Sequence, residues 1–232
     1  MADSLREPSG PSSEGADEIE EFDAIVIGSG VTGLYSLYRM RQLGFSVRAF
    51  DDAGGVGGTW YWNRYPGCRF DSARYSYGYS FSEELLQEWD WKDHYSSQPE
   101  TERYLNYVAD KFDLRRNIQF NSRVVSATFD EAESRWEIGL EDGSLARGQY
   151  LITSVGSFST GCVPDFEGID SFKGISCHTR RWPAEGIDLA GKRVGVIGTG
   201  ATHRGSTHYG DRQRGGTPDR IPADSELLRS PS

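Results

Sequence analysis

The chain has 232 residues and a formal net charge of −10, and 36% of its residues are hydrophobic while 12% are aromatic. That aromatic content excludes a wholly disordered chain, because disordered segments are poor in such residues. The acidic balance argues against a nucleic-acid binder, and no stretch approaches the roughly 18 apolar residues of a membrane span. We therefore expect neither nucleic acid nor a membrane as a partner.

The amino-terminal 21 residues carry seven acids and one arginine and show no apolar periodicity, so we expect a disordered leader over residues 1–21. This start lacks the basic and then apolar segments of a signal peptide. Cys68, Cys162 and Cys177 show no CxxC spacing, so nothing indicates a disulfide framework, a metal site or a redox dithiol. The sequence thus predicts a protein of the reducing cytoplasm.

Strand and helix signals alternate from residue 23 onward. A strand is predicted over 23–27, a helix over 32–43 closed by Gly44, and a second strand over 46–50. This order is a βαβ unit, whose parallel pairing implies an α/β fold.

Further elements follow along the chain. A helix is predicted from about residue 99 to 112, because Tyr104, Val108 and Phe112 recur at helical spacing. Alternating segments then indicate a β-meander that is inserted before the return strand. The predicted strands are 124–129, 135–140 and 150–154, and a last strand, 193–197, opens a second unit.

A glycine-rich loop, GSGVTG, follows the first predicted strand and opens the first helix. In that setting Gly28 permits the tight turn, Gly30 lets the backbone approach a pyrophosphate, and Gly33 allows close helix–strand contact. The helix N-terminus offers N–H groups and partial positive charge to phosphates. An acid at the end of the second strand would bind a ribose hydroxyl, and it is either Asp51 or Asp52.

A second glycine loop, formed by Gly198, Thr199 and Gly200, follows the last predicted strand. It is incomplete, because His203 stands at the position of the third glycine. Two dinucleotide sites indicate a flavin and a nicotinamide that exchange electrons, and the alternative is one site plus an unrelated glycine turn.

A third signal, GGVGGTWYWNRYPGCRFD, spans residues 54–71 and is followed by further aromatic residues. Its glycines would let backbone approach a planar cofactor, and its aromatic side chains would supply an apolar wall. By composition alone, an aromatic core with solvated arginines is an equal alternative.

Two long motifs resemble fingerprints of the Baeyer–Villiger monooxygenases. Residues 58–71 resemble GxWxxxx[FY]PGxxxD, and residues 172–183 are similar to FxGxxxHxxxWP. The second fingerprint is matched by Phe172, Gly174, His178, Trp182 and Pro183. The resemblance covers about residues 22–202 and is closest to the cyclohexanone and phenylacetone monooxygenase type.

The resemblance implies a Rossmann-like FAD-binding domain with the inserted β-meander over 22–156, itself incomplete. A linker and the start of a truncated Rossmann-like NADP-binding domain would follow over 157–202. The implied cofactors are FAD and NADP(H), and the implied reaction uses O2 to convert a small ketone to an ester or lactone. The alternative is a non-catalytic FAD-binding fragment of the same lineage, whereas the missing dithiol disfavours a disulfide-reductase-like flavoprotein.

Site residues are also implied by the resemblance. Arg69 to Asp71 would approach the nicotinamide, and Asp71 is the candidate catalytic residue. Gly198, Thr199 and Gly200 would start the NADP site. His178 and Trp182 would be hinge residues between the nucleotide domains, although a buried structural histidine and a packing tryptophan are equally compatible. The residues expected at FAD are Gly28, Ser29, Gly30, Gly33, Asp51, Gly58, Thr59, Trp60, Asp71, Tyr77 and Val124.

The resemblance ends near Thr202, and residues 203–232 show neither helical nor strand periodicity. If these residues are read one base out of frame, the stretch 203–213 can encode TGVQLITEIA, which restores the third glycine and an amphipathic helix. We therefore expect a disordered, out-of-frame tail over 203–232 and little affinity for NADPH. The alternative is a natural disordered tail rich in Arg, Gly, Ser and Pro.

Overall fold

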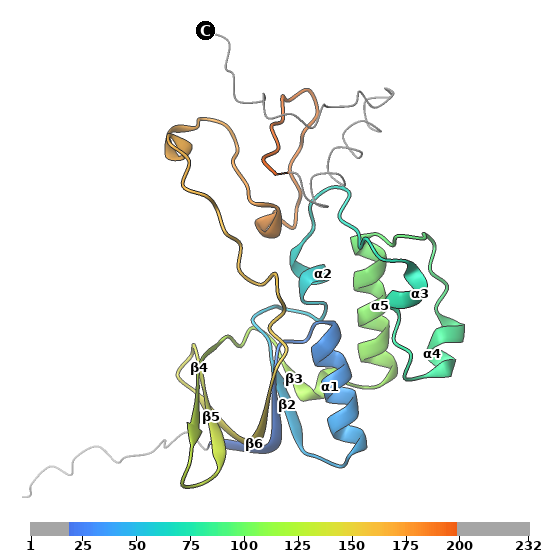
Figure 1. Cartoon of the computed structure of the whole chain (residues 1–232), viewed down its shortest axis with the longest axis vertical. Coiled ribbons are helices and arrows are strands. Elements are labelled where there is room, and N and C mark those ends of the chain that lie inside the picture. The colour runs from blue at the N-terminus through green and yellow to red at the C-terminus, as the bar shows by residue number, and fades with distance from the viewer. Residues whose placement is uncertain (1–18, 199–232) are drawn as a thin grey trace, which may run out of the picture. The chain divides into compact units, whose positions relative to one another are not determined.

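The structure, a computed structural model, describes residues 19–198 (Figure 1). Contacts divide them into two compact units, residues 19–55 with 112–155 and residues 56–111 with 156–198. The tail predicted over 203–232 lies outside the described residues, as does the leader up to residue 18. Glu20 and Glu21, which the sequence places in the leader, belong to the first strand, where they pair with a neighbouring strand.

The first unit begins with the predicted βαβ arrangement. Strand β1 (Glu20–Ile27) leads into helix α1 (Val31–Gln42), which is followed by strand β2 (Val47–Phe50). Gly44 has a φ of 85° just after α1, where its lack of a Cβ allows the left-handed turn. Strands β1 and β2 pair in parallel, which confirms the prediction from the sequence.

Six strands form one sheet in the order β3-β2-β1-β6-β5-β4. The first four run parallel, while β6, β5 and β4 form the predicted antiparallel meander. A single strand, β6, therefore serves both as the last meander strand and as the return strand beside β1. The remaining elements of this unit are η1 (Arg115–Asn117), β3 (Ile118–Gln119), β4 (Val124–Asp130), β5 (Arg135–Leu140) and β6 (Leu145–Thr153).

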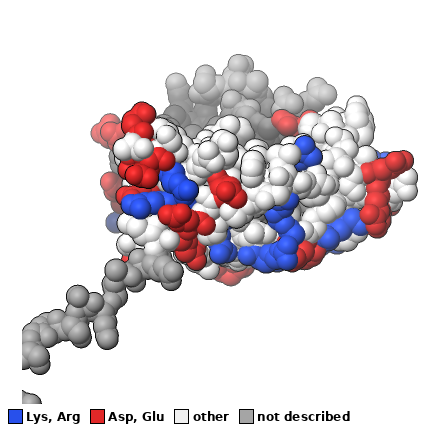
Figure 2. Space-filling model, turned by 90° about the horizontal axis from the view of Figure 1, so that it is seen from below, with Lys and Arg blue, Asp and Glu red and all other residues white. Residues whose placement is uncertain are grey.

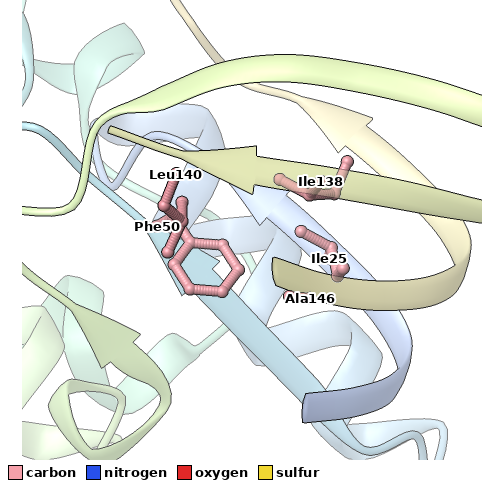
Figure 3. Packing of buried hydrophobic residues seen from close by; sticks show 5 residues of the cluster. All are labelled: Ile25, Phe50, Ile138, Leu140 and Ala146. Atoms are coloured by element: carbon pink, nitrogen blue, oxygen red, sulfur yellow. The ribbon is translucent and has the colours of Figure 1, made fainter. Parts of the chain in front are cut away.

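The sheet buries a cluster of apolar side chains from four strands. Ile25 of β1 and Phe50 of β2 meet Ile138 and Leu140 of β5 together with Ala146 of β6 (Figure 3). Because these strands are brought together by the meander, the cluster ties the meander to the βαβ unit. It is built from residues far apart in the sequence.

Charged side chains of both signs lie interspersed on the face of the molecule shown in Figure 2. In the first unit, Arg135 pairs with Glu21 at 3.0 Å and Arg147 with Glu137 at 2.8 Å. Such exposed pairs typically contribute less than about 1 kcal/mol, so the fold depends mainly on the apolar cluster.

The second unit is helical. The helix that we predicted over 99–112 is α5 (Gln98–Lys111), whose buried face includes Tyr104, Leu105 and Val108. Three helices were not predicted, because segments of four to six residues are too short to show a helical period. They are α2 (Thr59–Trp62), α3 (Arg74–Tyr77) and α4 (Glu83–Glu88).

Residues 156–198 contain only two short turns of 3-10 helix, η2 (Ile169–Ser171) and η3 (Thr179–Arg181). The strand predicted over 193–197 is wrong, because no strand is found there and Ile197 is 75% exposed. A strand needs a neighbour to accept and donate its backbone hydrogen bonds, and no described residue pairs with this segment. Among the described helices, none has the length and apolar character needed to cross a bilayer.

Candidate cofactor-binding site

The glycine loop lies tightly against two strands of the first unit. Gly28 has a φ of 97°, and a Cβ there would lie 2.6 Å from the carbonyl oxygen of Ser154 at the end of β6. A Cβ on Gly33 would lie 1.9 Å from the carbonyl oxygen of Gly28. Both positions therefore require glycine for the reasons that the motif predicts, a tight turn and a close helix–strand contact.

The N-terminus of α1 opens at this loop. Gly30 is the N-cap residue, with no side-chain cap hydrogen bond, and the first turn of α1 carries no acid. No side chain of that first turn therefore neutralises the positive end of the helix dipole, which suits a phosphate.

Ser154 provides an independent indication of a ligand beside the loop. Its backbone N–H donates to the carbonyl oxygen of Ile27 at 2.8 Å, which fixes the end of β6 next to the end of β1. Among the described residues, its buried Oγ finds no hydrogen-bond partner. A buried hydroxyl without a partner is costly, and a polar ligand at the loop would satisfy it. The residues present therefore fit a dinucleotide. We did not predict this residue, although its position at the carboxyl end of a parallel strand was a usable signal.

The acid at the end of β2 is Asp51. Its side chain is buried beside the loop, whereas Asp52 is exposed, so this geometry favours Asp51, and its role toward a ribose stays a prediction. The Asp51 carboxylate accepts hydrogen bonds at Oδ2 from Ser29 N at 2.5 Å and from Ser29 Oγ at 2.6 Å. Its Oδ1 accepts one from Ala53 N at 2.8 Å. The first loop and the acid thus lie in direct contact.

In the second unit, the first fingerprint folds into α2 and an aromatic wall. Gly58, with a φ of 54°, is the N-cap residue of α2, and Thr59 is its first residue. The buried Trp60 donates from Nε1 to the Tyr77 hydroxyl at 2.6 Å. Burial raises the pKa of Tyr77, although the Trp60 hydrogen bond partly opposes this. Tyr77 therefore stays a neutral phenol at physiological pH, and its ring stacks on Phe70 at 4.3 Å between centroids.

Gln98, which sequence reasoning missed, holds this wall in place. Its Nε2 donates to the carbonyl oxygen of Trp60 at 2.5 Å and to Glu102 Oε2 at 2.8 Å. Glu102 also pairs with Arg64 at 3.3 Å. The contacts join α2 to α5 across 38 residues of sequence, and a glutamine at a helix start gives no signal for them.

The other predicted residues near the first fingerprint have different surroundings. Arg69 and Asp71 are both exposed, and the negative charge of Asp71 contributes to raising the pKa of Tyr77. Val124, in the other unit, begins β4 opposite Leu140 and packs against the apolar cluster. Their expected roles toward nicotinamide and adenine stay predictions.

The second fingerprint forms a local turn. His178 precedes η3, and its Nδ1 accepts a hydrogen bond from the backbone N–H of Arg180 at 3.1 Å. Trp182 follows η3 and is partly buried together with Pro183, whereas Phe172 and Gly174 are exposed. In the second glycine loop, Gly198 has a φ of 127°, and Thr199 and Gly200 lie outside the described residues.

Strand β1, the glycine loop, helix α1 and the acid that follows β2 together define a dinucleotide-binding α/β protein. Residues 23–207 match the family described as Flavin-binding monooxygenase-like, and the chain belongs to this family.

Relatives support the resemblance to Baeyer–Villiger enzymes. The chain is 54% identical over 180 residues to acetone monooxygenase (methyl acetate-forming) of Gordonia sp. (strain TY-5), covering 78% of this chain and 34% of that protein. It is 48% identical over 183 residues to a Baeyer-Villiger monooxygenase of Pseudooceanicola batsensis, covering 78% and 33%. The chain thus spans about a third of the length of these relatives.

A solved structure supports the fold. An oxidised steroid monooxygenase bound to NADP matches with a TM-score of 0.79 and 48% sequence identity, covering 83% of this chain and 37% of that one. The α/β fold with a Rossmann-type FAD-binding domain is therefore confirmed.

Proposed function

We propose that this chain forms the FAD-binding part of a Baeyer–Villiger monooxygenase, which uses NADPH and O2 to convert a small ketone to an ester or lactone. The observation that carries the proposal is the glycine loop, where Gly28 and Gly33 allow the tight turn and the close helix–strand contact of a dinucleotide-binding motif, and where Asp51 lies next to the loop. The family and the named relatives support it.

Each part of FAD has residues suited to it. The pyrophosphate would lie at the N-terminus of α1, beside Gly30 and Ser154, and the adenosine ribose would lie at Asp51. Thr59 and the Trp60–Tyr77 pair would line the flavin ring. When bound, FAD supplies the electron storage and the reaction with O2 that protein side chains lack.

The protein's own residues bind, orient and exclude water. The Trp60 side chain is hydrogen-bonded to Tyr77, and its backbone carbonyl accepts a hydrogen bond from Gln98. Because of these contacts, the aromatic wall is fixed before any ligand binds. Such rigid apolar surfaces keep water from a reactive cofactor. Arg69 and Asp71 are exposed, as residues that meet an arriving nicotinamide cofactor should be. We also propose a cytoplasmic location, which suits the three free cysteines.

A glycine-to-valine pair tests FAD binding. Gly30 has a φ of −74°, which valine tolerates, so Gly30→Val should keep the fold but fill the space that the pyrophosphate needs. We expect FAD titration, followed by flavin fluorescence, to show binding by the parent and none by the variant. The control is Gly195→Val, where a Cβ meets nothing within 4 Å. Equal FAD affinity in Gly30→Val and the parent would contradict the proposal.

A non-catalytic FAD-binding role is the second candidate, because the chain spans only about a third of the length of its relatives. The two candidates differ in the oxidation of NADPH. A chain that binds FAD but neither oxidises NADPH nor forms an ester from a ketone would support the second candidate.

A further inference from the structure

The contact between Ser29 and Asp51 determines how much of the carboxylate is left for a ligand. Both residues are buried, and Ser29 supplies two donors to the same oxygen, Oδ2. The other oxygen, Oδ1, accepts a single hydrogen bond from Ala53 N. A carboxylate offers about four lone-pair sites, two on each oxygen. Oδ2 is therefore saturated, and one acceptor site remains on Oδ1.

We propose that Ser29 is a positioning residue that fixes Asp51 so that the carboxylate accepts one ribose hydroxyl and not two. The inference rests on the proposed binding of FAD. An acid at this place in the fold bonds the ribose 2′-hydroxyl, so the single remaining site on Oδ1 is assigned to that group. The 3′-hydroxyl then has no acceptor on Asp51.

The effect of Ser29 on the acceptor sites of Asp51 depends on its hydroxyl side chain. Any residue at position 29 carries the backbone N–H that reaches Oδ2, but only a hydroxyl side chain adds the second donor. Without that donor, Oδ2 regains an acceptor site, while the backbone N–H groups of residues 29 and 53 still bind the carboxylate. The loop backbone and the space for the pyrophosphate are unchanged by the loss of Oγ.

The contributions of the two ribose hydroxyls can be told apart with three nucleotides. ADP, 2′-deoxy-ADP and 3′-deoxy-ADP are titrated calorimetrically into the chain freed of flavin. We expect the parent to bind 3′-deoxy-ADP as tightly as ADP, and 2′-deoxy-ADP about tenfold or more weakly, since one hydrogen bond to a charged group is lost. In Ser29→Ala the acceptor site regained on Oδ2 can take the 3′-hydroxyl, so this variant should bind 3′-deoxy-ADP about threefold or more weakly than ADP.

Two further variants complete the design. Ser29→Thr keeps the hydroxyl and should restore the preference of the parent. Ser36→Ala is the matched control, because Ser36 lies in helix α1 just after the loop and its hydroxyl donates to the carbonyl oxygen of Thr32, not to a carboxylate. It should behave as the parent does.

The outcomes separate the inference from the proposed function. If the parent binds neither FAD nor ADP, the proposed function fails and the inference fails with it. If the parent binds FAD but Ser29→Ala still binds 3′-deoxy-ADP as tightly as ADP, or loses affinity for all three nucleotides equally, only the positioning role of Ser29 is overturned. Loss of folding in both Ser29→Ala and Ser29→Gly, with Ser29→Thr folded, would assign the hydroxyl to stability and also overturn it.

Discussion

At the scale of single residues, the glycine loop shows what sequence reasoning captures well. The motif predicts which positions must be glycine, because the tight turn and the close helix contact are local geometry. It does not predict that Ser29 binds Asp51, since that contact depends on how two segments 22 residues apart meet. The choice between Asp51 and Asp52 likewise depends on strand burial, which neighbouring elements decide.

Substitutions at Gly28 and Gly44 distinguish two costs of adding a side chain, an unfavourable φ and a steric clash. Gly28 and Gly44 have φ values of 97° and 85°, but only at Gly28 would a Cβ meet a backbone atom, the Ser154 oxygen. Gly44→Ala should lower the free energy of unfolding by about 1 kcal/mol through φ alone. Gly28→Ala should lower it by roughly 1–3 kcal/mol more, because the close contact adds to the strain. Urea denaturation checks both, and equal losses would contradict the contact.

At the scale of elements, the βαβ unit, helix α5 and the meander could be predicted, since each carries a long periodic pattern. The short helices α2, α3 and α4 could not, because too few residues repeat. The strand expected over 193–197 failed for a different reason. Its sequence has the right pattern, but a strand also needs a partner, and that information is not local.

The packing of the meander on the βαβ unit can be tested at Ile138. This residue is fully buried in β5 against the side chains of the apolar cluster. Ile138→Ala should destabilise the protein by about 2–5 kcal/mol through lost burial and a cavity. Val125→Ala, in the adjacent strand β4 and 58% exposed, should change stability by less than about 0.5 kcal/mol. Similar losses for the two variants in urea denaturation would argue against the assigned faces of the meander.

The start of β1 is joined to the loop before β2 by a pH-dependent contact. The Ser46 side-chain hydroxyl and backbone N–H donate to Asp23 and hold the pKa of its carboxyl below 3.8. A lowered pKa in the folded state means that this stabilisation is present above pH 3.8 and is lost as the pH falls through the lowered value.

The variant Ser46→Ala removes the hydroxyl of this contact. We expect its Tm to lie further below that of the parent at pH 7 than at pH 2. The difference that remains at pH 2 reflects the hydrogen bond from Asp23 N to Ser46 Oγ, which does not titrate. Ser36→Ala serves as the control without a carboxylate partner. A pH-independent difference for Ser46→Ala would refute the proposed contact.

At the scale of the whole molecule, protection of the backbone is uneven. The sheet of the first unit and α5 bury their apolar residues, whereas large apolar side chains within 156–198 are exposed. Phe158 is 73% and Phe172 63% exposed, against 1% for both Phe50 and Tyr104. Backbone with few buried contacts opens locally at little cost in free energy.

Brief digestion with chymotrypsin should therefore cut the described residues first within 156–198. The expected early products end near Phe158 or Phe172, and mass spectrometry identifies them. Early cleavage at Phe50 or Tyr104 would show that the order of protection is wrong.

The double role of β6 has a consequence for the newly made chain. During synthesis, β1 emerges from the ribosome long before β6, so Ala24 has no pairing partner on that side until Tyr150 has been made. Throughout that interval one edge of β1 stays open to foreign strands, and non-local pairing of this kind is slow. We expect that chains arrested on the ribosome before residue 145 are bound by chaperones and that chains arrested well beyond residue 153 are released. The strand that completes the sheet thereby also sets the moment at which the nascent protein becomes safe from aggregation.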